Sequence, residues 1–238
     1  MVHHTERSEQ VLVYLDDSRR FVIETDVLAV GGTEDGAWIA LRENVFHPQG
    51  GGQPADSGAV NGVPVVVARD YDTGLVTITA VGRDQPLPPL AKGDVVTATV
   101  DADARLRHAA LHTAGHLIEA LVQPYGWSTV GNNHFPDQAR VEFSVADLTP
   151  VGDPEGRAEV TARLRAAAAA AIEEALPVTA ATDADGLRTI TIGTLHTVPC
   201  GGTHVHDLSE LSELQLPDLR VKKGRVKASY SVEHRDRA

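Results

Sequence analysis

The sequence of 238 residues has a single cysteine, few aromatic residues and no long apolar segment. One cysteine excludes a disulfide within the chain, which fits a reducing compartment, so we expect a cytoplasmic protein. Residues 1–10 lack the apolar core of a signal peptide. No run of about 18 apolar residues is present, so we expect no membrane-spanning helix.

Charge and aromatic content limit how the protein can bind nucleic acid. Aromatic residues make up 4% of the chain, which disfavours a stacking platform for bases. The formal net charge is −12, whereas affinity for phosphate comes mainly from clustered Lys and Arg. These values exclude a general nucleic-acid coat, and a nucleic-acid substrate would require a local basic patch.

Short apolar runs punctuated by Gly, Asp and Pro predict a β domain at residues 1–100. Their spacing favours a small barrel or sandwich. Residues 101–238 mix helical and strand patterns, so we predict an α+β protein in which an N-terminal β domain, a barrel or a sandwich, is followed by a second domain of mixed helices and strands. We expect strands at residues 11–15, 21–23, 27–30, 38–41, 63–67, 75–79, 95–100, 140–143, 189–192 and 195–198. We expect helices at 101–123 and 153–176, and a hairpin at 219–232.

The only cysteine lies in the stretch Pro199-Cys200-Gly201-Gly202-Thr203-His204, where a predicted strand breaks into a turn. His112 and His116 lie four residues apart on the first predicted helix, so their imidazoles share one face while an apolar stripe packs on another. One thiolate and three imidazoles form a ligand set that suits zinc. Cys200 and His204 are also four residues apart, so one ion bound by both pairs would cross-link two distant segments of the chain.

The type of metal site stays open at this point. Thr113 stands where a His-Glu-x-x-His helix carries its glutamate, which disfavours a zincin protease. Four bound ligands would make a closed, structural site. If one ligand yields to water or substrate, zinc could orient an ester carbonyl or polarise a water. The glycines beside Cys200 leave room for a ligand and favour the second reading.

Two further stretches have both a structural and a functional interpretation. The glycine-rich segment from His47 to Gly58 is either a long hairpin loop or a backbone that a ligand can approach closely. The basic cluster of Lys222, Lys223, Arg225 and Lys227 either protects an edge strand or contacts phosphate. Arg105 and Arg107 are further candidates for phosphate contacts.

Three stretches together resemble the editing domain of alanyl-tRNA synthetases and their free-standing relatives, the AlaX alanyl-tRNA editing proteins. They are His112-Thr-Ala-Gly-His116, Cys200-Gly-Gly-Thr-His204 and Gly50-Gly-Gly-Gln-Pro-Ala-Asp-Ser-Gly58. The resemblance covers nearly the whole chain, and the N-terminal glycine motif is similar to the medium-length AlaX form. One departure is Gly115, because synthetase editing domains often carry Thr at that position.

The resemblance implies a β-barrel domain joined to a zinc-binding editing domain. It implies hydrolysis of the ester in mischarged tRNA(Ala), with Ser-tRNA(Ala) as the first candidate substrate and Gly-tRNA(Ala) as the second. It implies zinc as cofactor and tRNA as partner; we expect no membrane and no protein partner. Carried over by position, the metal ligands are His112, His116, Cys200 and His204. The implied aminoacyl pocket contains Gly50, Gly51, Gly52, Gln53 and Asp56.

Two other functions remain open from the residues alone. The chain could be a zinc-stabilised module that binds tRNA without hydrolysing it. It could also be a zinc hydrolase that acts on a small ester or amide.

Overall fold

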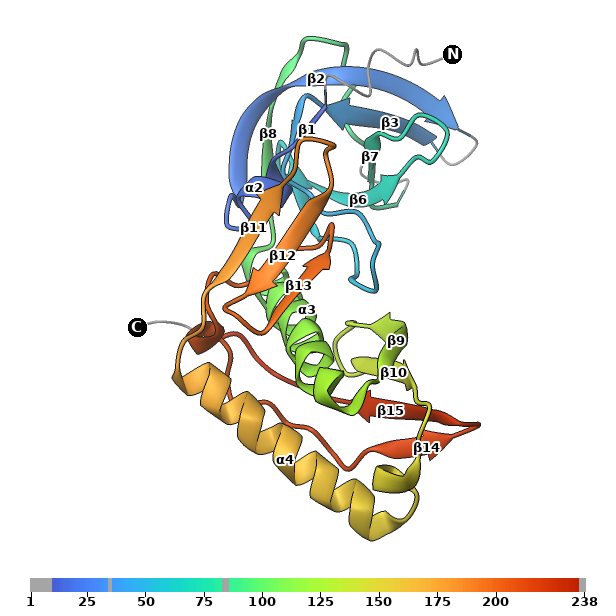
Figure 1. Cartoon of the computed structure of the whole chain (residues 1–238). Helices are drawn as coiled ribbons and strands as arrows, with labels where there is room; N and C mark the ends of the chain where they lie inside the picture. The colour runs from blue at the N-terminus through green and yellow to red at the C-terminus, as the bar shows by residue number, and fades with distance from the viewer. Residues whose placement is uncertain (1–9, 34–35, 83–85, 236–238) are drawn as a thin grey trace. The chain divides into compact units, whose positions relative to one another are not determined.

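The computed structural model describes residues 10–33, 36–82 and 86–235 (Figure 1). The chain forms two compact units, one of residues 1–50 and 54–105 and the other of residues 51–53 and 106–238. The first unit contains a β-barrel and the second is α/β, which confirms the predicted α+β class. The prediction that no signal peptide is present falls on residues 1–9, which lie outside the described part.

The barrel of the first unit has six antiparallel strands in the order β2-β3-β7-β6-β5-β8, closed by pairing of β8 with β2 (Figure 1). Alternate residues face its core, as with Val65 and Val67 on β6, because successive side chains of a strand point to opposite faces. The strands are β2 (Val22–Thr33), β3 (Gly36–Leu41), β5 (Gly58–Val60), β6 (Val63–Arg69), β7 (Val76–Ala80) and β8 (Val95–Val100). Two runs predicted separately, 21–23 and 27–30, belong to the single long strand β2.

The predicted strand at residues 11–15 is wrong. Only β1 (Val11–Leu12) is extended, and it pairs in parallel with β4 (Glu43–Asn44). The next residues form one helical turn, α2 (Val13–Asp16), which buries Tyr14. A short apolar run without alternation does not distinguish strand from helix, and burial of the tyrosine ring favours the turn here.

A buried ion pair supports the glycine-rich segment within the first unit. Arg105 and Asp56 are both fully buried at their side chains and bind each other, with Arg105 Nε 2.9 Å from Asp56 Oδ1. The guanidinium also donates to the carbonyls of Ser18 and Val45. Because Arg105 has no exposed surface, its predicted contact with phosphate is wrong.

The central element of the second unit is the helix α3 (Ala102–Val122), as predicted for residues 101–123, followed by the 3-10 turn η1 (Gln123–Tyr125). We expected one packed face and a separate face for the histidines. That expectation was too narrow, because every residue from 108 to 120 is buried. Small residues, including Ala110, Ala114 and Gly115, allow neighbouring segments to approach the helix on several sides.

Two antiparallel sheets accompany α3 in this unit (Figure 1). One has the strand order β14-β15-β10-β9 and contains the predicted hairpin, and the other has the order β11-β12-β13. The strands are β9 (Ser128–Asn133), β10 (Arg140–Ser144), β11 (Val178–Thr182), β12 (Arg188–Ile192), β13 (His196–Pro199), β14 (Arg220–Lys222) and β15 (Arg225–Ser229). Four strands, β4, β5, β9 and β11, were not predicted.

The second long helix is α4 (Pro154–Glu173). Asp153 caps it by accepting a hydrogen bond from the Gly156 amide. The helix ends before the predicted residue 176, because Ala175 adopts a left-handed conformation with φ of 51°. Two further 3-10 turns complete the unit, η2 (Thr149–Val151) and η3 (Leu208–Glu210).

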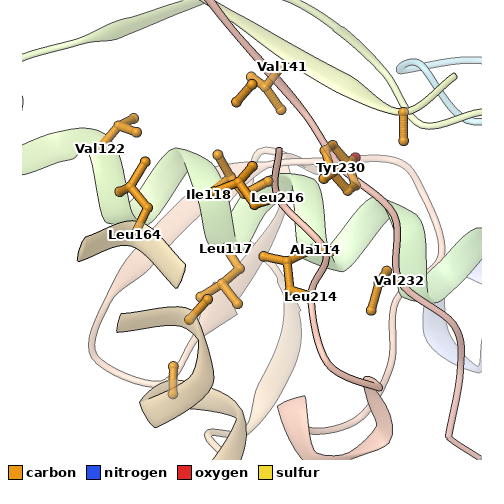
Figure 2. Close-up of a cluster of buried hydrophobic side chains, with 14 of the residues drawn as sticks. Ala114, Leu117, Ile118, Val122, Val141, Leu164, Leu214, Leu216, Tyr230 and Val232 are labelled. Carbon is orange, nitrogen blue, oxygen red and sulfur yellow. The ribbon is translucent and has the colours of Figure 1, made fainter. Parts of the chain in front are cut away.

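One apolar core joins α3 to α4, β10 and the C-terminal part of the chain (Figure 2). Figure 2 shows Leu117 and Ile118 of α3 among Leu164, Leu216 and Tyr230. Leu117 has no exposed surface, so truncating it to alanine would cost about 2–5 kcal/mol of unfolding free energy. This packing fixes the position of α3 and of the histidines that it carries.

Candidate metal centre

Helix α3 supplies two of the four predicted ligands. His112 and His116 lie one turn apart, and their rings are 5.0 Å apart between centroids. Their side chains are almost completely buried, with 1% and 5% of the residue surface exposed. Burial at a fixed helical spacing orients both rings toward the same point beside the helix.

The other two predicted ligands come from the turn that follows β13. Cys200 is held in place by Arg188, whose Nη1 donates to the Cys200 carbonyl at 2.6 Å and whose own carbonyl accepts from the Cys200 amide. After Gly201 and Gly202, the chain brings His204 back toward the cysteine. Cys200 is half-buried, whereas His204 is 5% exposed.

The four side chains converge within the second unit. Three imidazole Nε2 atoms surround Cys200 Sγ, at 3.4 Å for His112, 3.4 Å for His116 and 3.2 Å for His204. Bonds of ~2.3 Å to sulfur and ~2.0–2.1 Å to nitrogen separate the donor atoms of a tetrahedral site by roughly 3.5 Å. The donor set and its spacing therefore fit a tetrahedral metal ion, and the four residues form a candidate metal site.

Each ligand histidine has a hydrogen-bond partner at Nδ1, which leaves Nε2 directed at the cysteine. His112 Nδ1 lies 2.8 Å from Gln53 Oε1, and His204 Nδ1 lies 3.1 Å from Thr113 Oγ1. His116 Nδ1 lies 2.6 Å from a carboxylate oxygen of Glu119. Such partners fix the tautomer and the ring orientation of metal-binding histidines.

Glu119 and Thr113 were not identified from the sequence. A local signal existed for Glu119, because a residue three positions after His116 lies on the same face of the helix. Thr113 was considered only as the residue that replaces a protease glutamate. The structure shows that its hydroxyl contacts His204 and also accepts from the Val205 amide at 3.3 Å.

His134 is a fourth buried histidine, next to the three histidines of the cluster. Its ring stacks on His112, with centroids 4.4 Å apart and planes inclined by 20°. Tyr230 donates its hydroxyl to the Leu111 carbonyl, so it accepts from His134 Nδ1 at 2.6 Å. Among the described residues, His134 Nε2 is buried without a hydrogen-bond partner.

The position of His134 explains the glycine at residue 115. A Cβ atom on Gly115 would lie 2.4 Å from Cε1 of His134 and 2.8 Å from the Tyr230 hydroxyl. The threonine found at this place in synthetase editing domains would displace the His134 ring. The His134 ring therefore occupies the space that a side chain at residue 115 would need, and this accounts for the glycine there.

Burial and hydrogen bonding shift the pKa values of these groups in the metal-free protein. Burial acts to lower the pKa of His116, but hydrogen bonds to Cys200 and Glu119 outweigh it and raise the pKa to about 9. Burial raises the pKa of Glu119, and the bond to His116 overcomes that effect and lowers it. Burial, together with the charge of His116, lowers the pKa of His134 to about 4.

The glycine-rich segment contributes Gly51, Gly52 and Gln53 to the second unit. Gly51 and Gly52 have positive φ, at 56° and 79°. A Cβ on Gly51 would lie 4.0 Å from His112 Cε1, whereas one on Gly52 would lie 2.4 Å from Asn132 Oδ1. Gln53 is fully buried and contacts His112 and Thr203.

The other predicted site residues lie elsewhere. Gly50 and Asp56 belong to the first unit, where Asp56 is paired with Arg105. Lys222 and Lys223 are exposed at the turn between β14 and β15. The proposed roles of these four residues toward a substrate stay predictions.

A pocket of ≈350 Å³ borders the cluster, lined by His116, Glu119, Asn132, His196 and neighbouring residues. It offers polar groups beside one cluster residue, His116, and its partner Glu119. A larger hollow of ≈630 Å³, lined by Ile172, Leu214 and Arg235 among others, contains none of the clustered residues. No helix in the described part of the chain is long and apolar enough to cross a membrane.

Comparison with known proteins identifies similar sequences across most of the chain. The chain is 26% identical to the alanyl-tRNA editing protein AlaX-M of Pyrococcus horikoshii over 181 residues, which cover 74% of this chain and 78% of that protein. It is 26% identical to AlaX-L of the same organism over 86% of this chain, and spans about half (53%) of that protein.

A third similarity is to a much longer protein. The chain is 36% identical to the alanine–tRNA ligase of Pyrococcus abyssi over 139 residues. These residues cover 56% of this chain and 14% of the ligase. No protein-family model matches the chain. The matches confirm the resemblance seen in the motifs: the chain is similar to AlaX-type alanyl-tRNA editing proteins over most of its length, and to part of an alanine–tRNA ligase over about half of it.

Proposed function

We propose that the protein hydrolyses the ester bond of mischarged tRNA(Ala) at a zinc site. The observation that carries the proposal is the buried cluster of His112, His116, Cys200 and His204, in a chain similar to AlaX proteins. Three nitrogens and one sulfur at tetrahedral spacing suit zinc better than oxygen-preferring ions such as Mg²⁺ or Ca²⁺. When bound, zinc would supply a Lewis acid able to polarise an ester carbonyl or a water.

The residues around the cluster have separate tasks in this proposal. Gln53, Glu119 and Thr113 orient the ligand rings. Cys200 is half-buried whereas the three histidines are buried, so we expect an incoming group to approach the cluster from the cysteine side. Gly51 presents backbone without a side chain near His112, which leaves room for the aminoacyl group.

Serine is the first candidate for the acyl group. A synthetase pocket built for alanine cannot strongly reject serine, because one added hydroxyl yields discrimination of only about a hundredfold. Glycine is smaller than alanine by a methyl group and also enters such a pocket. A separate hydrolytic site removes both errors, and we place this activity in the cytoplasm, where mischarged tRNA is the partner.

The basic hairpin is the proposed contact with the tRNA backbone. Lys222, Lys223 and Arg225 are exposed at the β14–β15 turn. With a net charge of −12, the protein must rely on such a local cluster to bind a polyanion. Few phosphate contacts suit an enzyme that has to release the corrected tRNA.

Deacylation of Ser-tRNA(Ala) by the wild type, Cys200→Ala and His206→Ala tests the proposal. We expect Cys200→Ala to lose more than about 100-fold in rate, the upper limit typical for losing a partner that only orients a ligand. His206→Ala is the control, because His206 is an exposed histidine of the same stretch and lies outside the cluster. Binding of tRNA without hydrolysis by the wild type would favour a binding module, and hydrolysis of small esters alone would favour the other alternative.

A further inference from the structure

Gln53 links the glycine-rich segment to the metal cluster through three hydrogen bonds. Its Oε1 accepts from the Thr203 amide at 3.0 Å and contacts His112 Nδ1 at 2.8 Å, while its Nε2 donates to Thr203 Oγ1 at 2.9 Å. The side chain is fully buried, and its partners lie 59 and 150 residues away in the chain. All of these residues belong to the second unit.

The Thr203 amide determines how the Gln53 side chain is oriented. A backbone N–H can only donate, so the atom facing it must be the carbonyl oxygen of Gln53 rather than its NH2 group. A carbonyl oxygen cannot donate, so His112 Nδ1 must carry the proton. Its Nε2 then carries a lone pair and lies 3.4 Å from Cys200 Sγ, and this is the tautomer that a metal ion requires.

The backbone on both sides leaves this contact little freedom. A Cβ on Gly202 would lie 2.3 Å from His112 Nδ1 and 2.9 Å from Gln53 Oε1. On the other side, the carbonyl of Gly52 accepts from the His134 amide at 2.8 Å. Gln53 is therefore anchored through its side chain and through the residue that precedes it.

We infer that Gln53 is a positioning residue that couples the glycine-rich segment to the metal. The metal binds more tightly when residues 51–53 are in place. In turn, residues 51–53 are held more firmly when the metal is bound. The second effect follows from the first, because coupling between two binding equilibria is reciprocal. Residue 53 was predicted from the resemblance to shape the acyl pocket. That role stays a prediction, and the contacts add a second one, toward His112.

The inference rests on the proposed metal site but not on the deacylation reaction. Its readout is therefore the dissociation constant of zinc, obtained by competition with a chelator. Gln53→Met keeps the approximate volume and removes all three hydrogen bonds, and we expect zinc to bind about 10–100-fold more weakly. Gln53→Glu keeps an acceptor oxygen for His112 and the Thr203 amide, so we expect it to bind zinc no more weakly than the wild type. Gln49→Met is the control, because Gln49 is an exposed glutamine of the same segment.

Amide hydrogen exchange in the wild type tests the reciprocal effect without a variant. Removing zinc should accelerate exchange at Thr203, which donates to Gln53, and at His134, which donates to Gly52. Unchanged exchange at both amides would overturn the inference, even if Gln53→Met did not fold. Wild-type zinc affinity in a folded Gln53→Met protein would overturn it as well. Intact coupling with no deacylation would refute only the proposed function.

Discussion

The metal cluster and the basic hairpin differ in how the protein supports them. Each ligand histidine is at most 5% exposed and has a partner at its second nitrogen. Lys222, Lys223 and Arg225 are exposed, and none forms an ion pair with another described residue. Burial makes an unsatisfied polar group costly, whereas water solvates an exposed lysine. The role of a buried residue can therefore be inferred from its hydrogen-bond partners in the structure. The role of an exposed residue has to be measured with its ligand bound.

The largest effect should come from removing two ligands of the buried cluster. We expect the wild type to purify with about one zinc ion per chain and His112→Ala/Cys200→Ala with almost none, because two donors cannot complete a tetrahedral site. Elemental analysis measures this directly. Lys222→Ala/Lys223→Ala is the control and should keep its zinc. Full occupancy in the ligand variant would place the metal elsewhere.

A second prediction concerns pH, which should act on the buried region and not on the hairpin. The pKa of His134 is about 4 in the folded, metal-free protein and ~6.5 when unfolded. The unfolded chain thus binds more protons in this range, and stability should fall by about 3 kcal/mol as the pH drops from 6.5 to 4. His116, with a raised pKa of about 9, acts in the opposite sense and loses its stabilising contribution as the pH rises from 6.5 to 9.

Urea unfolding of the metal-free protein at several pH values measures the unfolding free energy on both the acid limb of this pH dependence, below pH 6.5, and the alkaline limb above it. The stability attributable to these two histidines should be greatest near pH 6.5. His134→Asn should flatten the acid limb, whereas His206→Asn, at an exposed histidine, should not. An acid limb of the same steepness in His134→Asn would show that other groups cause it.

The third prediction compares two adjacent glycines. A Cβ on Gly202 would lie 2.2 Å from His112 Cε1, while one on Gly201 meets nothing within 4 Å. We expect Gly202→Ala to displace His112, to lower the unfolding free energy by about 1–3 kcal/mol and to weaken zinc binding. Gly201→Ala should resemble the wild type in both. Equal behaviour of the two variants in chelator competition and urea unfolding would contradict the packing described here.

The smallest effect should come from the hairpin. Lys222→Ala/Lys223→Ala should weaken tRNA binding and reduce the slope of log affinity against log salt by at most about two units. Turnover at saturating substrate should change little, since neither lysine is proposed to touch the ester. Titrations at several salt concentrations provide the slope. A collapse of turnover with unchanged binding would place the hairpin in the catalytic site.

Sequence patterns predicted the features that depend on local spacing. The short apolar run at residues 63–67 indicated a strand, and the pairs at i and i+4 indicated the cluster that the structure brings together. The hairpin at Lys223-Gly224 was predicted for the same reason.

Features that depend on tertiary packing were not predicted. The contact of Gln53 with His112 joins positions 59 residues apart, and the pair of Asp56 and Arg105 joins positions 49 apart. Neither pair leaves a periodic signal. The helical turn at Tyr14 was missed because burial of one ring overrode an apolar run typical of a strand. His134 could be recognised only after its ring was seen in the space beside Gly115.

Zinc-dependent deacylation is tested by a zinc titration of the metal-free protein, with deacylation of Ser-tRNA(Ala) measured at each point. We expect that activity is absent without metal, rises in proportion to added zinc and saturates at about one ion per chain, the capacity of a single tetrahedral site. Full activity in the metal-free protein, or zinc binding with no deacylation at any point, would contradict it.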